Sequence, residues 1–194
     1  MRSIGARGKV ERAALDLFAA EGIDGVSIAE IAAAAGVSQG ALYRHYPSKD
    51  ELAWVLFSTA YLRTGAELDA IRAREPSFRS RINAMVGHFC GLYDSDPALF
   101  RFMLIAQHDL LPRIGREERT PVDAVADTVA DAIQSGEVGT IEPPAAVAII
   151  MGIVLQTAVF HIYGRLAGSL RACSAGLARA AIAAIEEMGR AENE

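Results

Sequence analysis

The sequence predicts an all-α protein of about nine helices, in which a small three-helix head precedes a larger helical bundle. Apolar residues recur at intervals of three and four, which is the spacing of one helix face. The alternation of apolar and polar residues that marks a half-buried strand is absent. Prolines stand where helices should begin: Asp96-Pro97 and Thr120-Pro121 each place a capping residue before a proline at the first helical position.

Capping boxes mark two further helix starts, at Ser27 with Glu30 and at Ser48 with Glu51. At this spacing each side chain accepts a hydrogen bond from the backbone N–H of the other residue. The predicted helices span residues 6–21, 28–34, 39–45, 49–73, 77–93, 97–109, 121–135, 144–165 and 168–189. The first three are short and the following ones are long enough for a bundle. We therefore predict a helix-turn-helix domain at residues 1–48 and a ligand-binding and dimerisation domain at residues 49–194.

The composition fits one or two folded domains. The chain has 194 residues, of which 52% are hydrophobic and 22% are charged. Its net charge of −5 argues against a protein that coats nucleic acid through bulk charge. However, residues 1–50 hold six basic and six acidic residues, whereas residues 51–194 hold thirteen basic and eighteen acidic ones. All the net acidity therefore lies in the larger domain, and local geometry decides what the head binds.

Cysteine usage and the N-terminal residues indicate a cytoplasmic protein. Cys90 and Cys173 have no CxxC partner, so neither a disulfide scaffold nor a zinc knuckle is expected. The N-terminal residues MRSIGARGKV contain no apolar region of the kind found in a secretory signal peptide. We therefore expect reduced thiols and a cytoplasmic location.

An uncharged stretch at residues 145–164 is long enough to cross a bilayer. It contains Gln156, Thr157 and His161, is rich in weakly hydrophobic alanine and stands without a second span, so we expect no membrane segment. A helix that is apolar on all sides otherwise packs against its own domain with one face and against a second subunit with another.

The two C-terminal helices are therefore the expected dimer interface. We predict a homodimer through helices 144–165 and 168–189, with a purely intramolecular core as the alternative. In the second helix the expected contact stripe consists of apolar and small residues at spacing three or four: Leu170, Cys173, Leu177, Ala181, Ala184 and Met188.

Residues 27–49, with the sequence SIAEIAAAAGVSQGALYRHYPSK, have the layout of a helix-turn-helix. Two very short helices are joined by a turn in which Gly36 can take φ > 0 and Ser38 can cap the next helix. Helices this short are not stable alone, so the first helix of the chain must hold them. Its apolar face consists of Val10, Ala14, Leu15 and Phe18.

The second short helix presents a surface that is rich in hydrogen-bond donors and free of carboxylates: Gln39, Gly40, Tyr43, Arg44 and His45. This surface suits DNA, because arginine pairs with guanine and glutamine with adenine in the major groove, while tyrosine, serine and lysine hold phosphates. The preceding residues 1–12 form a basic arm, with Arg2, Arg7, Lys9 and Arg12, that can reach the DNA backbone or the minor groove. The alternative is an ordinary alanine-rich hairpin with a solvated basic tail.

Several motif elements occur in order within residues 9–56 of this chain: Ala13–Phe18, Gly22, Ser27–Ala32, Ala35–Ser38, Gly40–Tyr46, Lys49 and Leu52. Together they resemble the TetR family of bacterial transcriptional regulators. The rest of the chain resembles that family only in length, helical plan and a closing pair of long helices.

The resemblance implies a homodimer whose two heads read the half-sites of a palindromic double-stranded DNA operator. The body would bind a small-molecule effector that alters the spacing of the heads. The positions that match the family's motif make Gln39, Gly40 and Arg44 candidates for base contacts. The candidates for phosphate contacts are Ser27, Ser38, Tyr43, His45 and Lys49. Ala29 has no polar group that could reach a base, so we expect few side chains to contact the bases.

The body supplies aromatic residues and methionine suited to an apolar ligand pocket. The candidate pocket residues are Tyr61, Phe89, Tyr93, Phe102, Met103, His108 and Phe160, and a role in the plain core is the alternative for each. His88, His108 and His161 lack HxxxH spacing, so no metal site is expected. No cofactor is expected either.

No enzyme motif is present: the chain lacks a G-x-S-x-G elbow, a Walker loop, a G-x-G-x-x-G after a strand and HExxH. Asp123, Asp127 and Asp131 repeat every four residues and are expected to form a solvated helix face. We therefore expect a ligand-responsive regulator without enzymatic activity, and family analogy favours a repressor. The alternatives are an activator of the same family and a helical small-molecule binding protein that does not bind DNA.

Overall fold

The computed structural model describes residues 5–191, and helices joined by turns account for the regular structure of that range. The chain separates into two compact units. Of the described residues, the first unit contains those up to Tyr61 together with Asp96–Glu118, and the second contains Leu62–Ser95 together with those from Arg119 onward. This division follows spatial contacts, and the functional boundary at residue 48 stays a prediction.

The predicted all-α fold class is confirmed, and each predicted helix is present to within a few residues. Within residues 5–191 the helices are α1 (Ala6–Gly25), α2 (Ile28–Ala35), α3 (Gln39–Tyr43), α4 (Lys49–Arg74), α5 (Phe78–Ser95), α6 (Pro97–Leu110), α7 (Pro121–Gln134), α8 (Pro143–Ile162) and α9 (Leu170–Ala191). A 3-10 turn at Leu111–Arg113 follows α6. Helix α1 is broken near its end by Gly22, which has φ 80° and ψ 164°, so the regular helix stops where the sequence predicts.

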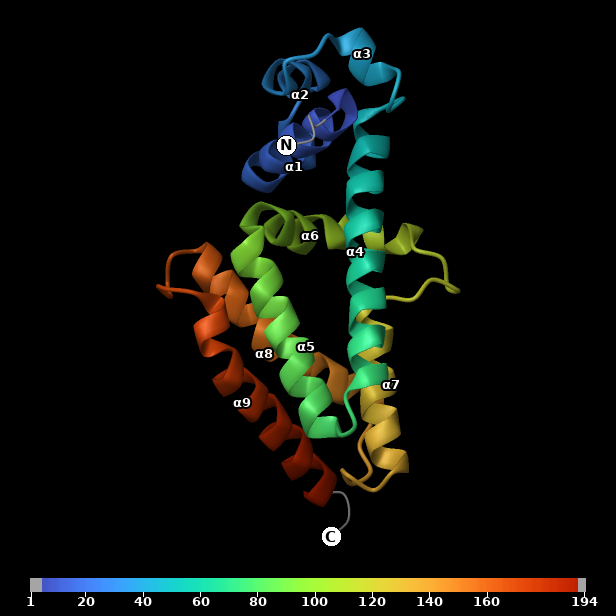
Figure 1. Ribbon diagram of the computed structural model, residues 1–194, viewed down its shortest axis with the longest axis vertical. Coiled ribbons are helices and arrows are strands. Elements are labelled where there is room, and N and C mark those ends of the chain that lie inside the picture. The colour runs from blue at the N-terminus through green and yellow to red at the C-terminus, as the bar shows by residue number, and fades with distance from the viewer. Residues whose placement is uncertain (1–4, 192–194) are drawn as a thin grey trace. The chain divides into compact units, whose positions relative to one another are not determined.

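The core of the first unit is built around α1. Phe18 is fully buried and stacks on Phe102 of α6, with ring centroids 5.9 Å apart. The predicted inner face of α1 is buried as expected: Val10, Ala14, Leu15 and Phe18. Figure 1 shows α2 and α6 beside α1, in agreement with the packing of these helices. The three-helix head therefore shares its core with α6, a contact that local sequence signals do not reveal.

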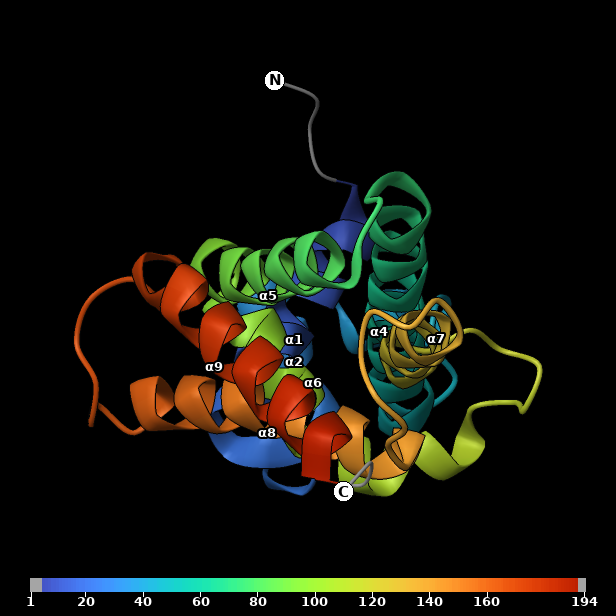
Figure 2. The same ribbon diagram turned by 90° about the horizontal axis from the view of Figure 1, so that it is seen from below.

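In the second unit α9 packs along α5 and against α8, as Figures 1 and 2 show from two directions. Leu170, Ala181 and Ile185 of α9 are buried in this core. Helix α7 packs on α8 and α5. These four helices, together with the part of α4 that follows Tyr61, form the bundle.

Asp94, at the end of α5, caps the start of α9. Its carboxylate accepts hydrogen bonds from the Ser169 hydroxyl and from the backbone N–H groups of Leu170 and Arg171, at 2.5, 3.0 and 2.9 Å. Partial burial raises the pKa of Asp94, but these hydrogen bonds outweigh that effect and hold the pKa below its ordinary value. The carboxylate thus serves as a cap supplied by a neighbouring helix.

Replacing Asp94 with asparagine is expected to lower the free energy of unfolding by about 1 kcal/mol at neutral pH. The folded-state pKa is depressed, so the contribution of the charge is present above the unfolded pKa of about 3.9 and is lost as the pH falls through the folded value. Urea unfolding of Asp94→Asn and wild type between pH 7 and pH 3 measures this difference, which should shrink toward acid pH. Asp109→Asn is the control, because Asp109 is exposed and has no ion-pair partner among the described side chains. A difference that did not change with pH would contradict the cap.

The aspartates of α7 are engaged, so the expectation of a solvated helix face was wrong. Asp131 accepts from Arg72 Nε and from Arg81 Nη1, both at 2.9 Å. Arg119 Nη2 donates to Asp127 at 2.9 Å and to Asp69 at 2.7 Å. Three arginines thus join α7 to α4 and α5. The partners come from 50 or more positions away, except for the Arg119–Asp127 pair, and local spacing could not indicate them.

Asp123 has a different local role, as the third residue of the α7 capping box. Its carboxylate accepts from the Thr120 N–H at 2.9 Å, and the Thr120 hydroxyl oxygen accepts from the Asp123 N–H at 3.3 Å. The predicted helix start at Thr120-Pro121 is therefore confirmed with its reciprocal cap.

Candidate nucleic-acid interface

The turn between α2 and α3 has the geometry that the sequence predicts. Gly36 is left-handed, with φ 66° and ψ 37°, and its N–H donates to the Ala33 carbonyl at 3.1 Å. The next N–H, of Val37, reaches back to the Ala32 carbonyl at 3.0 Å, which closes the end of α2. Ser38 then caps α3 by accepting from the Ala41 N–H at 3.1 Å. The turn fixes the direction in which α3 leaves α2.

Helix α3 is held by one buried side chain and exposes most of the others. Leu42 is completely buried, whereas Gln39, Gly40, Tyr43, Arg44 and His45 are all exposed. The helix ends at Tyr43, two residues earlier than predicted, but Arg44 keeps helical angles of φ −67° and ψ −24°. His45 and Tyr46 both donate their N–H groups to the Leu42 carbonyl, at 2.9 and 3.0 Å. The candidate base-contact residues thus lie on one short, outward-facing segment.

The two candidate serines have structural partners. The Ser27 N–H and hydroxyl both donate to the Glu30 carboxylate at 2.7 Å, which completes the predicted capping box at the start of α2. The hydrogen bonds from the Ser27 hydroxyl and then from its backbone N–H lower the pKa of Glu30. The Ser38 hydroxyl oxygen caps α3. Phosphate contact by either residue stays a prediction, as do the other proposed DNA contacts.

Lys49 contacts the end of α1. Its Nζ lies 3.5 Å from the backbone carbonyl oxygen of Asp24, in the last turn of that helix. A cation at this position is favourable because helix C-termini carry partial negative charge. The long bond leaves the ammonium two further protons for a phosphate oxygen.

The basic arm is divided among several environments. Arg2 lies outside the described residues. The guanidinium of Arg12 forms ion pairs with Asp16 and Asp96. Lys9 is exposed. Arg7 Nε donates to Glu11 at 2.8 Å. These contacts assign different structural roles to residues that the sequence places in one cluster.

Tyr46 follows residues 39–45, which we call the reading segment, and links the end of that segment to α1. Its ring is buried and its hydroxyl donates to Glu11 Oε1, while Arg7 Nε lies 3.2 Å from the same hydroxyl oxygen. Burial, followed by the hydrogen bond to Glu11, raises the pKa of Tyr46 to about 12. The hydroxyl therefore remains a protonated donor throughout the neutral range. Its apolar packing is expected from the sequence, whereas its polar partner 35 positions away is not.

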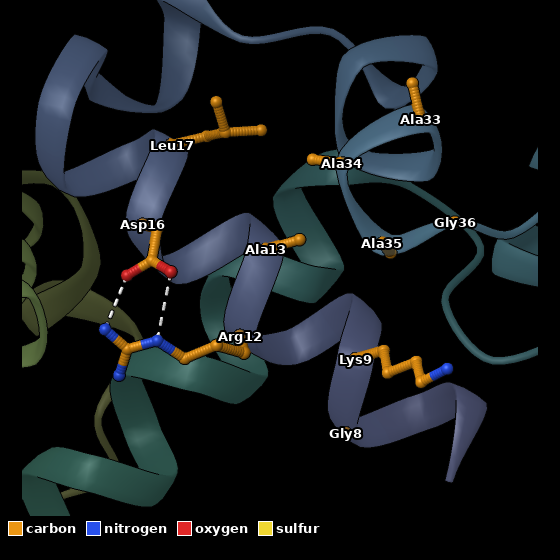
Figure 3. A pocket seen from close by; sticks show the side chains of 10 residues that line it. All are labelled: Gly8, Lys9, Arg12, Ala13, Asp16, Leu17, Ala33, Ala34, Ala35 and Gly36. Carbon is orange, nitrogen blue, oxygen red and sulfur yellow. Dashed lines mark hydrogen bonds and ion pairs between the residues drawn. The ribbon is translucent and has the colours of Figure 1, made fainter. Parts of the chain in front are cut away.

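A groove of about 590 Å³ runs between α1 and the end of α2 (Figure 3). Its α2 side is formed by Ala33, Ala34, Ala35 and Gly36, so this part of α2 offers no polar side chain. On the α1 side Arg12 points to Asp16, and Lys9 stands apart from that ion pair. None of the side chains predicted to contact DNA therefore comes from residues 33–36.

The bundle unit contains two long helices with exposed small residues. Helix α8 is the one described helix that is long and apolar enough to cross a membrane, by length and composition alone. Only 33% of the most apolar 18-residue stretch of this helix is buried. Its exposed residues include Ala145, Ala148, Gly152, Gln156 and Phe160, and those of α9 include Ala172, Cys173, Gly176, Ala180 and Ala183.

The predicted contact stripe of α9 does not form a single exposed face. Leu170 and Ala181 are buried within their own unit, Leu177 is half-buried and Cys173 is exposed. Because α9 packs on both α5 and α8, part of the stripe belongs to the intramolecular core. The exposed small residues lie one position further round the helix, at Ala172, Gly176, Ala180 and Ala183.

The candidate pocket residues are divided between the two units. Tyr61, Phe102, Met103 and His108 belong to the first unit, and Phe89, Tyr93 and Phe160 belong to the second. Phe102 is part of the core around Phe18, and Tyr61 stacks on Phe57 at 5.1 Å. Tyr93 contacts His161, with ring centroids 5.8 Å apart. Ligand contact by these side chains stays a prediction. In the described part of the chain, no three His, Cys, Asp or Glu side chains gather as a metal site would require.

The family model that matches this chain covers residues of the head and the start of α4. The sequence model of the family described as bacterial regulatory proteins, tetR family, matches residues 12–53. A protein of Mycobacterium tuberculosis named as a mycofactocin biosynthesis transcriptional regulator, MftR, is 43% identical over 61 residues. That match spans 31% of this chain and 31% of the relative. The family model therefore matches the part of the chain that contains the helix-turn-helix.

Solved structures extend the similarity to the whole fold. The fatty acid degradation regulator FadR from Bacillus halodurans matches with a TM-score of 0.79 at 15% identity, covering 93% of this chain and 96% of that one. The regulator FadR from Bacillus subtilis in complex with stearoyl-CoA matches with a TM-score of 0.73 at 17% identity, covering 89% and 96%. At these identities the likeness shows a common fold, which includes the bundle as well as the head.

Proposed function

We propose that the chain is a member of the TetR family, whose sequence model matches residues 12–53, and that it is a ligand-responsive repressor that binds a palindromic operator as a homodimer. It acts on DNA in the cytoplasm and catalyses no reaction. The effector is a small molecule that binds in the bundle and releases the protein from DNA.

One observation carries this proposal: the exposed surface of α3 and of the two residues after it contains hydrogen-bond donors and no carboxylate. This helix is capped by Ser38 and follows a turn that begins at Gly36. A segment of this kind suits insertion into a major groove, where base edges are read by side-chain donors. Two such segments about one helical turn of DNA apart (~34–36 Å) are the usual requirement of a helix-turn-helix dimer.

The dimer is supported by the exposed small residues of α8 and α9. Alanine and glycine allow helix backbones to approach closely, and an apolar helix that is only one-third buried needs a further covering. We infer that the second subunit supplies this covering, in an intermolecular four-helix bundle.

The effector is proposed to be predominantly apolar. The bundle is rich in aromatic and aliphatic side chains, and small-molecule pockets are mostly lined by such groups. The complex of Bacillus subtilis FadR with stearoyl-CoA shows a protein of the same fold in contact with an acyl ligand. The proposal does not extend to that ligand, because the identity is 17%.

The proposal is tested with a labelled duplex that contains the intergenic DNA beside the protein's own gene. We expect specific binding with steep weakening as the salt concentration rises, because contact with phosphates releases counterions. Scrambled DNA of the same length and composition is the control. Equal affinity for the two duplexes would reject sequence-specific regulation, and binding of apolar ligands without any DNA binding would favour the helical binding protein.

Arg44→Ala and Lys49→Ala are expected to separate base readout from phosphate contact. Arg44→Ala should change the preference among operator base substitutions by roughly 1–3 kcal/mol, because a bidentate contact with guanine is lost. Lys49→Ala should weaken all duplexes about equally and reduce the salt slope by about 1. Fluorescence anisotropy with single-substitution operators measures both effects. Equal behaviour of the two variants would remove Arg44 from base readout.

A further inference from the structure

We propose that Glu11 and Tyr46 are positioning residues that hold the guanidinium of Arg7 at a binding site for a phosphate of the DNA backbone, at the start of α1. This inference rests on the proposed DNA-binding function and adds a site and two positioning residues to it. The site joins the first turn of the chain's first helix to the end of the reading segment.

Three side chains form a closed set of hydrogen bonds at this point. Arg7 Nε lies 2.8 Å from Glu11 Oε1 and 3.2 Å from the Tyr46 hydroxyl oxygen. Tyr46 donates its own proton to the same Glu11 oxygen. The Arg7 Cζ atom also lies 5.9 Å from the centroid of the Tyr46 ring, within cation–π range. The side chain of Arg7 is thereby held in one place by two partners.

Stability of the head does not require this arrangement. The Arg7 side chain is 63% exposed, and an exposed ion pair at spacing four adds little to folding. The Tyr46 ring fills the core, and a phenylalanine ring would fill the same space. What the hydroxyl adds is a fixed position for Glu11 and, through it, for Arg7. A contact that orients an exposed cation without a large gain in stability is typical of a binding surface.

The donors that remain on Arg7 suit a phosphate. Its hydrogen bonds to Glu11 and Tyr46 both use Nε, and Nη1 and Nη2 have no partner among the described residues. Arginine presents these amino groups in a planar fork that matches the oxygens of a phosphate. Arg7 lies in the first turn of α1, where the helix end is electropositive and the N-cap residue Gly5 has no side chain to satisfy it.

The position of the site indicates which phosphate it binds. Tyr46 follows Arg44 and His45, the last exposed residues of the reading segment, so Arg7 is one hydrogen bond away from that segment. The Glu11 carboxylate accepts from both Arg7 and Tyr46, and Lys9, which Gly8 separates from Arg7, is exposed. A phosphodiester beside the groove that α3 enters is the anion that this geometry fits.

The test uses the whole chain and two labelled duplexes, the intergenic fragment and its scrambled counterpart, over a range of salt concentrations. Arg7→Ala is expected to weaken both duplexes by a similar factor, and the slope of log affinity against log salt should fall by about 0.9, the loss of one phosphate contact. Tyr46→Phe keeps the ring and removes the hydroxyl. It should weaken both duplexes several-fold, and in the Arg7→Ala background it should have no further effect.

Arg63→Ala is the matched control, because Arg63 forms a similar exposed pair with Glu67 in the other unit, and its DNA affinity should equal that of wild type. An unchanged salt slope in Arg7→Ala would overturn the phosphate site. Additive effects of Tyr46→Phe and Arg7→Ala would overturn the positioning role. Failure of the wild type to bind either duplex would instead reject the proposed function, so the two failures are distinguishable.

Discussion

Gly65→Ala is expected to lower the free energy of unfolding by about 1–3 kcal/mol, the usual cost of overpacking a close contact. A Cβ atom at Gly65 of α4 would lie 2.5 Å from the carbonyl oxygen of Arg119 and 2.9 Å from the carbonyl carbon of Thr120. Both atoms belong to the backbone, so no side chain can rotate to make room. The segment before α7 must move away from α4 instead.

That movement would also disturb polar contacts on each side of Gly65. Arg119 forms a two-pronged ion pair with Asp69, one turn along α4, with distances of 3.0 and 2.7 Å. Thr120 caps α7. Both contacts depend on the backbone of Arg119 lying against Gly65, so displacement of that backbone loosens the ion pair and the cap together.

Gly87→Ala on α5 is the matched control, because nothing lies within 4 Å of the position of its Cβ atom. Alanine is favoured over glycine by about 1 kcal/mol inside a helix, so this variant should be as stable as wild type or more stable. Urea unfolding followed by circular dichroism compares the two variants. Gly65→Ala with wild-type or higher stability would show that α7 is not held closely to α4.

If the proposed homodimer forms through α8 and α9, Gly152→Arg is expected to convert it into a monomer and to weaken operator binding by about 100-fold or more. Gly152 is exposed in the middle of α8, and nothing lies within 4 Å of its Cβ position within one subunit. Arginine is a better helix former than glycine, so the helix itself should gain stability. A long charged side chain at a closely packed helix contact between subunits would have no room and no partner.

The large effect on DNA follows from linkage of the two heads. Binding of one head to its half-site raises the effective concentration of the other at the second half-site, and this can add a factor of about 10²–10⁴ to the affinity. Light scattering coupled to size-exclusion chromatography measures the mass, and fluorescence anisotropy measures operator binding. Ala130→Arg, at an exposed position of α7, is the control and should remain dimeric. A dimeric Gly152→Arg with wild-type affinity would place the interface elsewhere.

The helix starts could be predicted because their determinants lie within four residues of one another. Ser27 with Glu30, Ser38, Asp96 and Thr120 all cap the helices that the sequence assigns to them. The end of α2 could be predicted equally well, since only a glycine readily adopts the left-handed angles of Gly36.

Contacts between segments that lie far apart in the sequence could not be predicted from local sequence patterns. The position of Phe102 against Phe18 makes α6 part of the head's core, although its sequence reads as an ordinary amphipathic helix of the body. Asp131 was expected to be solvated because its partners, Arg72 and Arg81, lie at least 50 positions away. The same is true of the candidate site: the exposed residues of α3 follow from the helix-turn-helix pattern, but the bond between Tyr46 and Glu11 depends on how α1 crosses the segment after α3.

The positive φ angles of Gly36 and Gly22 determine how tolerance of substitutions in this head should be interpreted. At both positions nothing lies within 4 Å of the place that a Cβ atom would occupy, yet any residue with a side chain is strained by the backbone itself. Gly40 also has open space, but it lies in α3 with ordinary helical angles, where alanine is compatible with the fold. In a library of variants selected for the proposed repression, intolerance at Gly22 and Gly36 would indicate a folding defect. Intolerance at Gly40 would instead indicate loss of the proposed contact with the operator.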